Sequence, residues 1–303
     1  MSDSTANTSR VNQRVTAFLR YVRDRPRLRI VLLVGLPFAT LLGFFVFPLL
    51  SMISISFLDG LPPASFTLEN YTRIVTSDVY YTIFWRTTVI TIQTTLIVTV
   101  LGYAFAYSIV RFSKRVTVAL LLLILPFWTN YIVRMYAWIN ILQRDGLLDT
   151  VLIFVGILNE PTGLLYSHTA VLIGFTYIWL PLSTLAFYAS LTDLDPDLID
   201  AAKDLGAGPI KTFFVVTLPL TFNGVIVGVI LVAIPTFGAF ITPVLLGGTD
   251  NVMIGMVIEN QFIEAFNWPL GAALGTIVSM VVIAVTVGAV VAGGDVLGRG
   301  DSS

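Results

Sequence analysis

Polar and aromatic side chains recur between residues 127 and 138 at the spacing of one helix face. The stripe consists of Phe127, Asn130, Tyr131, Arg134 and Trp138, which follow the three- and four-residue steps that bring side chains together on a helix. Aromatic rings attract ammonium groups through cation–π contacts, so the stripe could line a path for an amine. It could equally hold a partner protein.

Covalent chemistry has no comparable support in the sequence. The chain has no Cys and a single His, His168, for which we expect a structural role. It shows no cluster of metal-ligating residues, no glycine-rich phosphate loop and no nucleophile motif. The net charge of −1 gives no electrostatic case for nucleic acid. We therefore expect no catalytic residue, no metal site, no cofactor bound by this chain and no nucleic-acid partner.

The composition indicates a membrane protein, because only 12% of the residues are charged, against about a quarter in soluble domains. Each of six runs without Asp, Glu, Lys or Arg is long enough to cross a bilayer, which takes roughly 20 apolar residues as a helix. The runs are 30–58, 87–110, 116–133, 161–192, 212–249 and 265–294. The sequence thus predicts an all-α integral membrane protein with six transmembrane helices in the lipid bilayer.

Positive charge should set the orientation of these helices. Arginine clusters beside a span stay in the cytoplasm, and seven arginines precede the first run: Arg10, Arg14, Arg20, Arg23, Arg25, Arg27 and Arg29. Six spans then place both termini in the cytoplasm. We divide the chain into a cytoplasmic Arg-rich segment, 1–29, a six-helix transmembrane domain, 30–293, and a cytoplasmic tail, 294–303.

All acidic residues fall outside the six runs. Those expected on the outer face outnumber the four arginines there and are Asp59, Glu69, Asp78, Asp145, Asp149, Glu160, Asp250, Glu259 and Glu264. This excess would favour the approach of a cation, or it simply solvates the loops. A tight cation site at the bilayer midplane would need a buried carboxylate. We therefore expect this chain to supply a weak, conducting path.

A hydrophilic segment, 193–219, is expected on the cytoplasmic face between the fourth and fifth runs. Asp195 and Pro196 are typical of a helix start, because Asp caps free amides and Pro fits the first turn. Gly206 and Gly208 permit the positive φ that ends a helix. Pro209 can begin a second helix that reaches the fifth span. The segment therefore predicts two short helices joined by a turn.

The spacing within this segment resembles the EAA loop of binding-protein-dependent ABC importer permeases. Asp200-Ala201-Ala202 is followed after three residues by Gly206, and after nine more by Val216-Thr217-Leu218-Pro219. The family pattern is Glu-Ala-Ala, Gly and Ile-x-Leu-Pro at the same spacing, so Asp200 and Val216 depart from it. The resemblance implies a coupling helix that docks on an ATP-hydrolysing subunit. The coupling residues would be Asp200, Ala201, Ala202, Gly206, Leu218 and Pro219.

Three further segments resemble spermidine/putrescine permeases: PFWTNYIVRMYAWINIL at 126–142, LENYTRIV at 68–75 and NWPLGAA at 267–273. The resemblance implies a type I ABC importer permease of the bacterial cytoplasmic (inner) membrane, itself without catalytic activity. Its expected partners are a second permease subunit, two ATPase subunits that bind ATP and Mg, and an extracytoplasmic substrate-binding protein. Importers of other small amines or organic solutes share much of these segments. A carrier driven by an ion gradient is the alternative from a different class.

Overall fold

The computed structural model describes residues 31–60 and 63–298 as an all-helical chain with one isolated β-bridge, Leu58 to Phe66. The predicted Arg-rich segment 1–29 lies outside the described residues. Of the predicted tail, residues 294–298 continue the last helix. The chain divides into two units, one ending at Ile55 and one beginning at Ser56. The first unit carries η1 (Val31–Gly35) and nearly all of α3 (Leu36–Ser56), which matches the first predicted span.

The second unit contains the other helices of the described residues. Its first half comprises α4 (Glu69–Thr76), α5 (Asp78–Phe112), α6 (Val116–Ile124), η2 (Leu125–Trp128), α7 (Tyr131–Leu142), α8 (Leu147–Phe154) and α9 (His168–Thr192). Its second half comprises α10 (Pro196–Asp204), α11 (Pro209–Thr212), η3 (Phe213–Thr217), α12 (Leu218–Leu220), α13 (Phe222–Phe237), α14 (Ile241–Leu246), η4 (Thr249–Asn251), α15 (Ile254–Ile263) and α16 (Trp268–Gly298).

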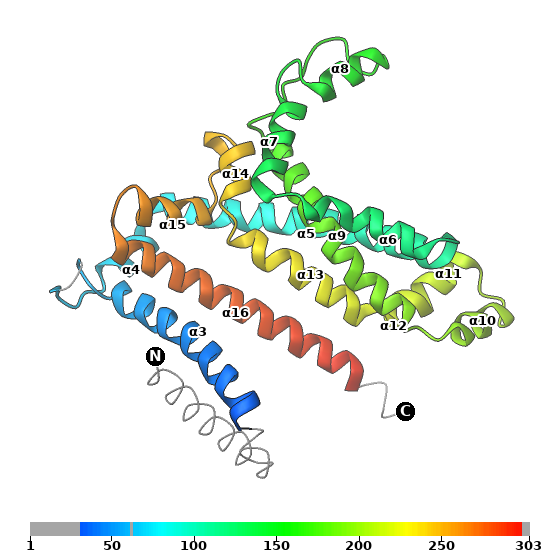
Figure 1. The fold of residues 1–303 in the computed structure, drawn as a ribbon, viewed down its shortest axis with the longest axis horizontal. Coiled ribbons are helices and arrows are strands. Elements are labelled where there is room, and N and C mark those ends of the chain that lie inside the picture. Colours follow the sequence, from blue (N-terminus) through cyan, green and yellow to red (C-terminus); the bar gives the residue numbers. More distant parts are fainter. Residues whose placement is uncertain (1–30, 61–62, 299–303) are drawn as a thin grey trace, which may run out of the picture. The chain divides into compact units, whose positions relative to one another are not determined.

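Three long helices, α5, α9 and α13, form the centre of this unit. α5 and α9 pack along each other, α13 lies against both, and α16 lies against α13 and α15 (Figure 1). Phe187 of α9 is fully buried between two glycines, Gly102 on α5 and Gly228 on α13. Small residues at helix contacts let the backbones approach closely. These glycines therefore set the spacing of the three helices.

Length and composition identify four helices able to cross a membrane, or up to six if each of two bent pairs counts as one span. The first pair bends by 93° between 116–128 and 131–154. The prediction of one continuous helix over 116–133 is therefore wrong. Thr129 adopts an extended conformation, and the Asn130 side chain accepts the N–H of Ile132 at 2.8 Å, which starts a new helix.

The second bend, of 67°, separates residues 209–220 from α13 and falls at Thr221. Pro219 lacks an amide hydrogen, which weakens helical hydrogen bonding at this point. The Thr221 hydroxyl pairs with the Tyr103 hydroxyl of α5 at 2.7 Å, and Ser190 of α9 donates to the Thr221 carbonyl at 3.2 Å. The bend is thus held by two of the central helices.

Candidate coupling segment and transport path

The segment predicted to couple the chain to an ATPase folds as two short helices joined by a turn. The Asp195 carboxylate caps α10 by accepting the Asp197 N–H at 3.0 Å, and Pro196 occupies the first turn. At the other end Gly206 has φ +80°, and the Ala207 N–H donates to the Ala202 carbonyl at 3.0 Å. These features confirm the predicted start and end of the helix.

Gly208 plays a different part from the one predicted. Its φ is −67°, so it needs no left-handed conformation, and it caps α11, which begins at Pro209. The chain continues from α11 through a π-helical turn, η3, into α12, where Pro219 lies in the first turn. Gly206 therefore makes the turn, and Gly208 only precedes α11.

The α10 helix presents small and apolar groups to solvent. Ala201 is exposed and Ala202 is half-buried. Leu205, at the end of α10, is 90% exposed, and Ile210 on α11 is 76% exposed. Apolar side chains this accessible on an otherwise polar helix are typical of a contact surface for another protein. We call the surface formed by these four residues the α10 surface.

Asp200 is engaged within its own helix. Its carboxylate accepts a hydrogen bond from the Lys203 ammonium at 2.6 Å, and both side chains are exposed. The hydrogen bond and charge of Lys203, with a smaller contribution from Arg111, hold the pKa of Asp200 below its usual value. Such an exposed pair contributes little to stability. Lowering the pH through this depressed pKa would protonate Asp200 and remove the pair.

The two remaining coupling candidates lie apart from the α10 surface. Leu218 is half-buried against the cluster that contains Tyr103 and Phe187. Pro219 follows it on α12, two residues before the bend at Thr221. These residues join the coupling segment to the helix core, whereas the α10 surface faces outward.

The predicted stripe at 127–138 does not lie on one helix, because the bend after Thr129 divides it. Phe127 belongs to η2, Asn130 caps α7, and the others lie on α7. Arg134 nevertheless reaches back over the Phe127 ring, with its guanidinium carbon 5.1 Å from the ring centroid, and lies 5.9 Å from the Tyr131 centroid. Trp138 packs edge-on against Tyr177 of α9 at 5.4 Å. The structure thus brings Phe127, Tyr131 and Arg134 together, whereas Trp138 packs against α9.

Asp149 is one of the nine acids expected on the outer face, but it is buried, with only 2% of its surface exposed. It accepts hydrogen bonds from the Thr162 hydroxyl at 2.7 Å and from the backbone N–H groups of Thr162, Asp145 and Gly163 at 3.2–3.3 Å. Asp149 therefore organises the loop after α8 and is not available to an approaching cation.

We expect Asp149→Asn to loosen this loop, because the amide NH₂ would face N–H donors that now meet a carboxylate. Hydrogen exchange of peptides covering 143–166 should become several-fold faster, while α5 and α9 keep their protection. Glu160→Gln is the control, because it neutralises an exposed acid in the same loop. Equal exchange in the Asp149 and Glu160 variants would contradict the structural role.

Two other acids that are expected on the outer face share a cavity with aromatic rings. Glu259 and Glu264 of the α15 region line a cavity of about 510 Å³ together with Tyr136 and Phe240. Asn260 donates to the Glu264 carboxylate. Carboxylates beside aromatic rings are groups that favour organic ammonium ions. The structure thus brings two of the nine acids into one cavity.

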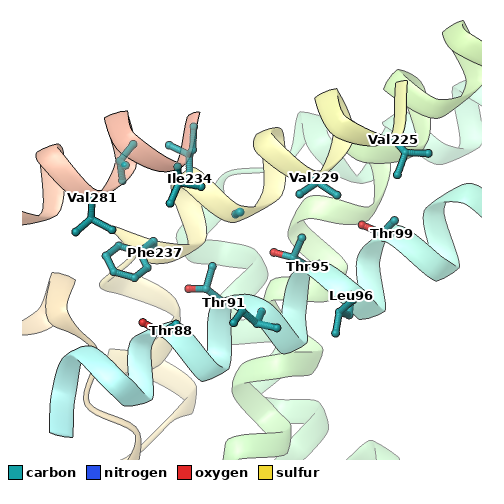
Figure 2. Close-up of a pocket in the computed structure, with 14 residues that line it drawn as sticks. Thr88, Thr91, Thr95, Leu96, Thr99, Val225, Val229, Ile234, Phe237 and Val281 are labelled. Atoms are coloured by element: carbon teal, nitrogen blue, oxygen red, sulfur yellow. The ribbon is translucent and has the colours of Figure 1, made fainter. Parts of the chain in front are cut away.

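A row of threonines on α5, which our reading of the sequence missed, lines a larger apolar cavity of about 550 Å³. Figure 2 shows Thr88, Thr91, Thr95 and Thr99 in line along α5, facing Val225, Val229 and Ile234 of α13 and Val281 of α16. The hydroxyls of Thr91, Thr95 and Thr99 are buried without a hydrogen-bond partner. Six threonines within residues 87–99 were the available signal. The cavity therefore has an apolar surface without charged side chains.

His168 has the structural role predicted for it. Its Nε2 lies 2.6 Å from Oε1 of Gln93, which joins the start of α9 to α5. Within residues 31–60 and 63–298, no group of three or more His, Asp or Glu side chains is placed to hold a metal ion.

Comparison with known proteins identifies the family. No family model matches the chain. The spermidine/putrescine transport system permease protein PotB of Escherichia coli K12 is 38% identical over 243 residues, which cover 78% of this chain and 88% of that protein. The chain belongs to the PotB family of permeases. PotB of Haemophilus influenzae is likewise 38% identical, over 80% of this chain and 86% of its own length.

The fold of this permease agrees with that membership. A chain of a bacterial alginate ABC transporter, crystallised in complex with an alginate pentasaccharide-bound periplasmic protein, superposes with a TM-score of 0.74. The match covers 89% of this permease and 96% of the other chain at 13% identity. It shows that the two share a fold. This permease is therefore a multi-pass membrane protein with the fold of an ABC importer subunit.

Proposed function

We propose that this chain is one permease subunit of an ATP-driven importer that carries polyamines, spermidine or putrescine, across the bacterial inner membrane. The observation that carries the proposal is the 38% identity to PotB proteins over more than three quarters of the chain. The cavity that holds Glu259 and Glu264 beside aromatic rings supports a cationic substrate. We further propose six spans with both termini in the cytoplasm.

The partners follow from the same proposal. A second permease subunit would complete the pathway, two ATPase subunits would bind ATP and Mg, and an extracytoplasmic binding protein would deliver the polyamine. This chain itself would be non-catalytic. The α10 surface would dock on an ATPase, so that closure of the ATPases shifts the permease pair between outward- and inward-facing states. The ATPases can drive this shift only if their contact with the α10 surface differs in free energy between the two states.

Ala201→Trp tests the docking assignment. We expect radiolabelled spermidine uptake to fall at least tenfold and co-purified ATPase to be lost, because the indole would fill the space that the small side chain leaves for a partner. Lys203→Trp is the matched control, since it adds similar bulk to the same helix about 200° around its axis. The amount of permease in the membrane should stay constant in both.

The outcome also separates the alternatives. Normal uptake and ATPase recovery in Ala201→Trp would remove the α10 surface from the docking site. If the wild-type chain purifies without any ATPase, and collapse of the proton gradient alone abolishes uptake, the chain is an ion-driven carrier instead. Uptake that excess spermidine and putrescine do not compete would assign another amine or organic solute as substrate.

A further inference from the structure

The helix α8 and the residues that follow it present an apolar surface to the outside of the unit. Residues 146–159 contain a single ionisable side chain, that of Asp149. Five large apolar side chains of this segment are between 48% and 89% exposed: Leu147, Val151, Phe154, Val155 and Ile157. The first three share one helix face by steps of four and three residues. We call the surface formed by these five residues the α8 surface.

Hydrogen bonds hold the opposite face of α8 against the chain. Asp149 lies about 200° from Leu147 around the helix axis, and its carboxylate accepts the Thr162 hydroxyl and three backbone N–H groups. The Leu165 N–H donates to the Leu142 carbonyl at 2.9 Å, which ties the same loop to the end of α7. The α8 surface therefore points away from the unit in a fixed direction.

The bend after Thr129 sets the level at which α7 and α8 leave the central helices (Figure 1). Residues 116–128 begin after the basic loop 111–115, which is expected at the cytoplasmic boundary, and α6 packs beside α5 and α9. A helix of this length rises about 20 Å, whereas the hydrocarbon core is about 30 Å thick. The chain then turns by 93°. Residues 131–154 therefore run across the outer half of the bilayer rather than out of it.

The side chains of the α8 surface suit lipid better than a protein partner. Helices that pack together in membranes use small residues at their contacts, as Gly102 and Gly228 do around Phe187. The α8 surface has only large aliphatic and aromatic side chains. A binding protein that dissociates between rounds of transport would return these side chains to water each time, which is unfavourable.

We propose that the α8 surface lies against lipid of the outer leaflet and anchors this outer segment to the membrane. The inference rests on the orientation proposed above, in which the chain enters the bilayer at residue 116 from the cytoplasm. Lipid would keep the five apolar side chains out of water. Arg144 and Asp145 before the segment and Glu160 after it can stay among the headgroups. Asp149, the one charge within it, faces the loop instead of the lipid.

The contact can be measured directly, because the chain has no native Cys. Phe154→Cys, labelled with a thiol-reactive fluorophore, is placed with its accompanying subunits in vesicles of phosphatidylcholine with brominated acyl chains. We expect the brominated lipid to lower its fluorescence at least twofold relative to unbrominated vesicles, and aqueous iodide to have little effect. Leu152→Cys is the matched control, because Leu152 lies on the same helix but is half-buried. Its label should be quenched much less by the lipid.

Either of two other results would overturn the proposal. Strong quenching of the Phe154→Cys label by iodide would show that the α8 surface faces water. Protection from both quenchers would show that protein covers it, whether the second permease or the binding protein.

The orientation is tested separately with a membrane-impermeant thiol reagent on spheroplasts. Arg144→Cys, at an exposed position just before α8, should react from outside. If it reacts only after the membrane is opened, the outer leaflet is wrong and the proposal fails together with the proposed orientation. Neither measurement uses transport. Failure of the polyamine assignment would therefore appear in uptake assays and leave the quenching by lipid unchanged.

Discussion

Gly206→Val should reduce spermidine uptake about tenfold while the chain remains in the membrane. Gly206 has φ +80°, and a side chain added there would meet nothing within 4 Å. The penalty therefore comes from the backbone alone, about 1–2 kcal/mol for a left-handed residue and more for a β-branched one. Uptake assays with membrane fractions normalised for permease content measure the effect.

Two substitutions make this result specific to the left-handed turn. Gly208→Val adds the same side chain two residues away, at φ −67° and again with nothing within 4 Å, so we expect nearly normal uptake. Gly206→Asn should retain most activity, because Asn tolerates the left-handed region. If Gly208→Val is as damaging as Gly206→Val, side-chain bulk rather than backbone conformation limits docking.

Gly228→Val should greatly reduce the amount of correctly folded protein. A Cβ at this position would overlap the ring of Phe187, which is fully buried between α5, α9 and α13. Overpacking a core typically costs about 1–3 kcal/mol, and this overlap falls where three helices meet. We expect a loss of more than tenfold in the monodisperse fraction in detergent, measured by size-exclusion chromatography.

The Phe187 contact can be tested by a double-mutant cycle. Phe187→Ala alone should destabilise the chain by leaving a cavity, but it should make Gly228→Val nearly harmless, because the valine methyls then occupy free space. Gly288→Val, on an exposed part of α16 where nothing lies within 4 Å of an added Cβ, is the control for valine in a membrane helix. Additive costs for Gly228→Val and Phe187→Ala would show that Phe187 is not the obstacle.

Local signals predicted the coupling segment well. The Asp195-Pro196 pair and Gly206 act through backbone groups within a few residues, so the sequence contains all that is needed to place α10. The long uncharged runs likewise located the helices of the core, because hydrophobicity over a bilayer's thickness needs no knowledge of neighbours. Gly208 was misassigned because a glycine permits a positive φ without requiring one.

Features that depend on distant parts of the chain were harder to predict. An uncharged run shows that a segment can enter a bilayer but not whether its helix axis bends, so the 93° bend after Thr129 was missed. Arg134 and Phe127 were expected on one helix face, but they meet across that bend. Asp149 resembles an ordinary loop acid in the sequence, because the Thr162 hydroxyl that donates a hydrogen bond to it lies thirteen residues further along the chain. The cavity beside the α5 threonines required the positions of α13 and α16.

The bend at Thr221 determines how a displacement of residues 209–220 would be passed to α13. Residues 209–220 meet α13 at 67°, closer to a right angle than to a straight line. A displacement along the axis of that segment would therefore have a larger component across α13 than along it. Tyr103 and Ser190 hold the junction itself, so the outcome would be a tilt of α13 about a fixed end, with its far end near α14 moving most.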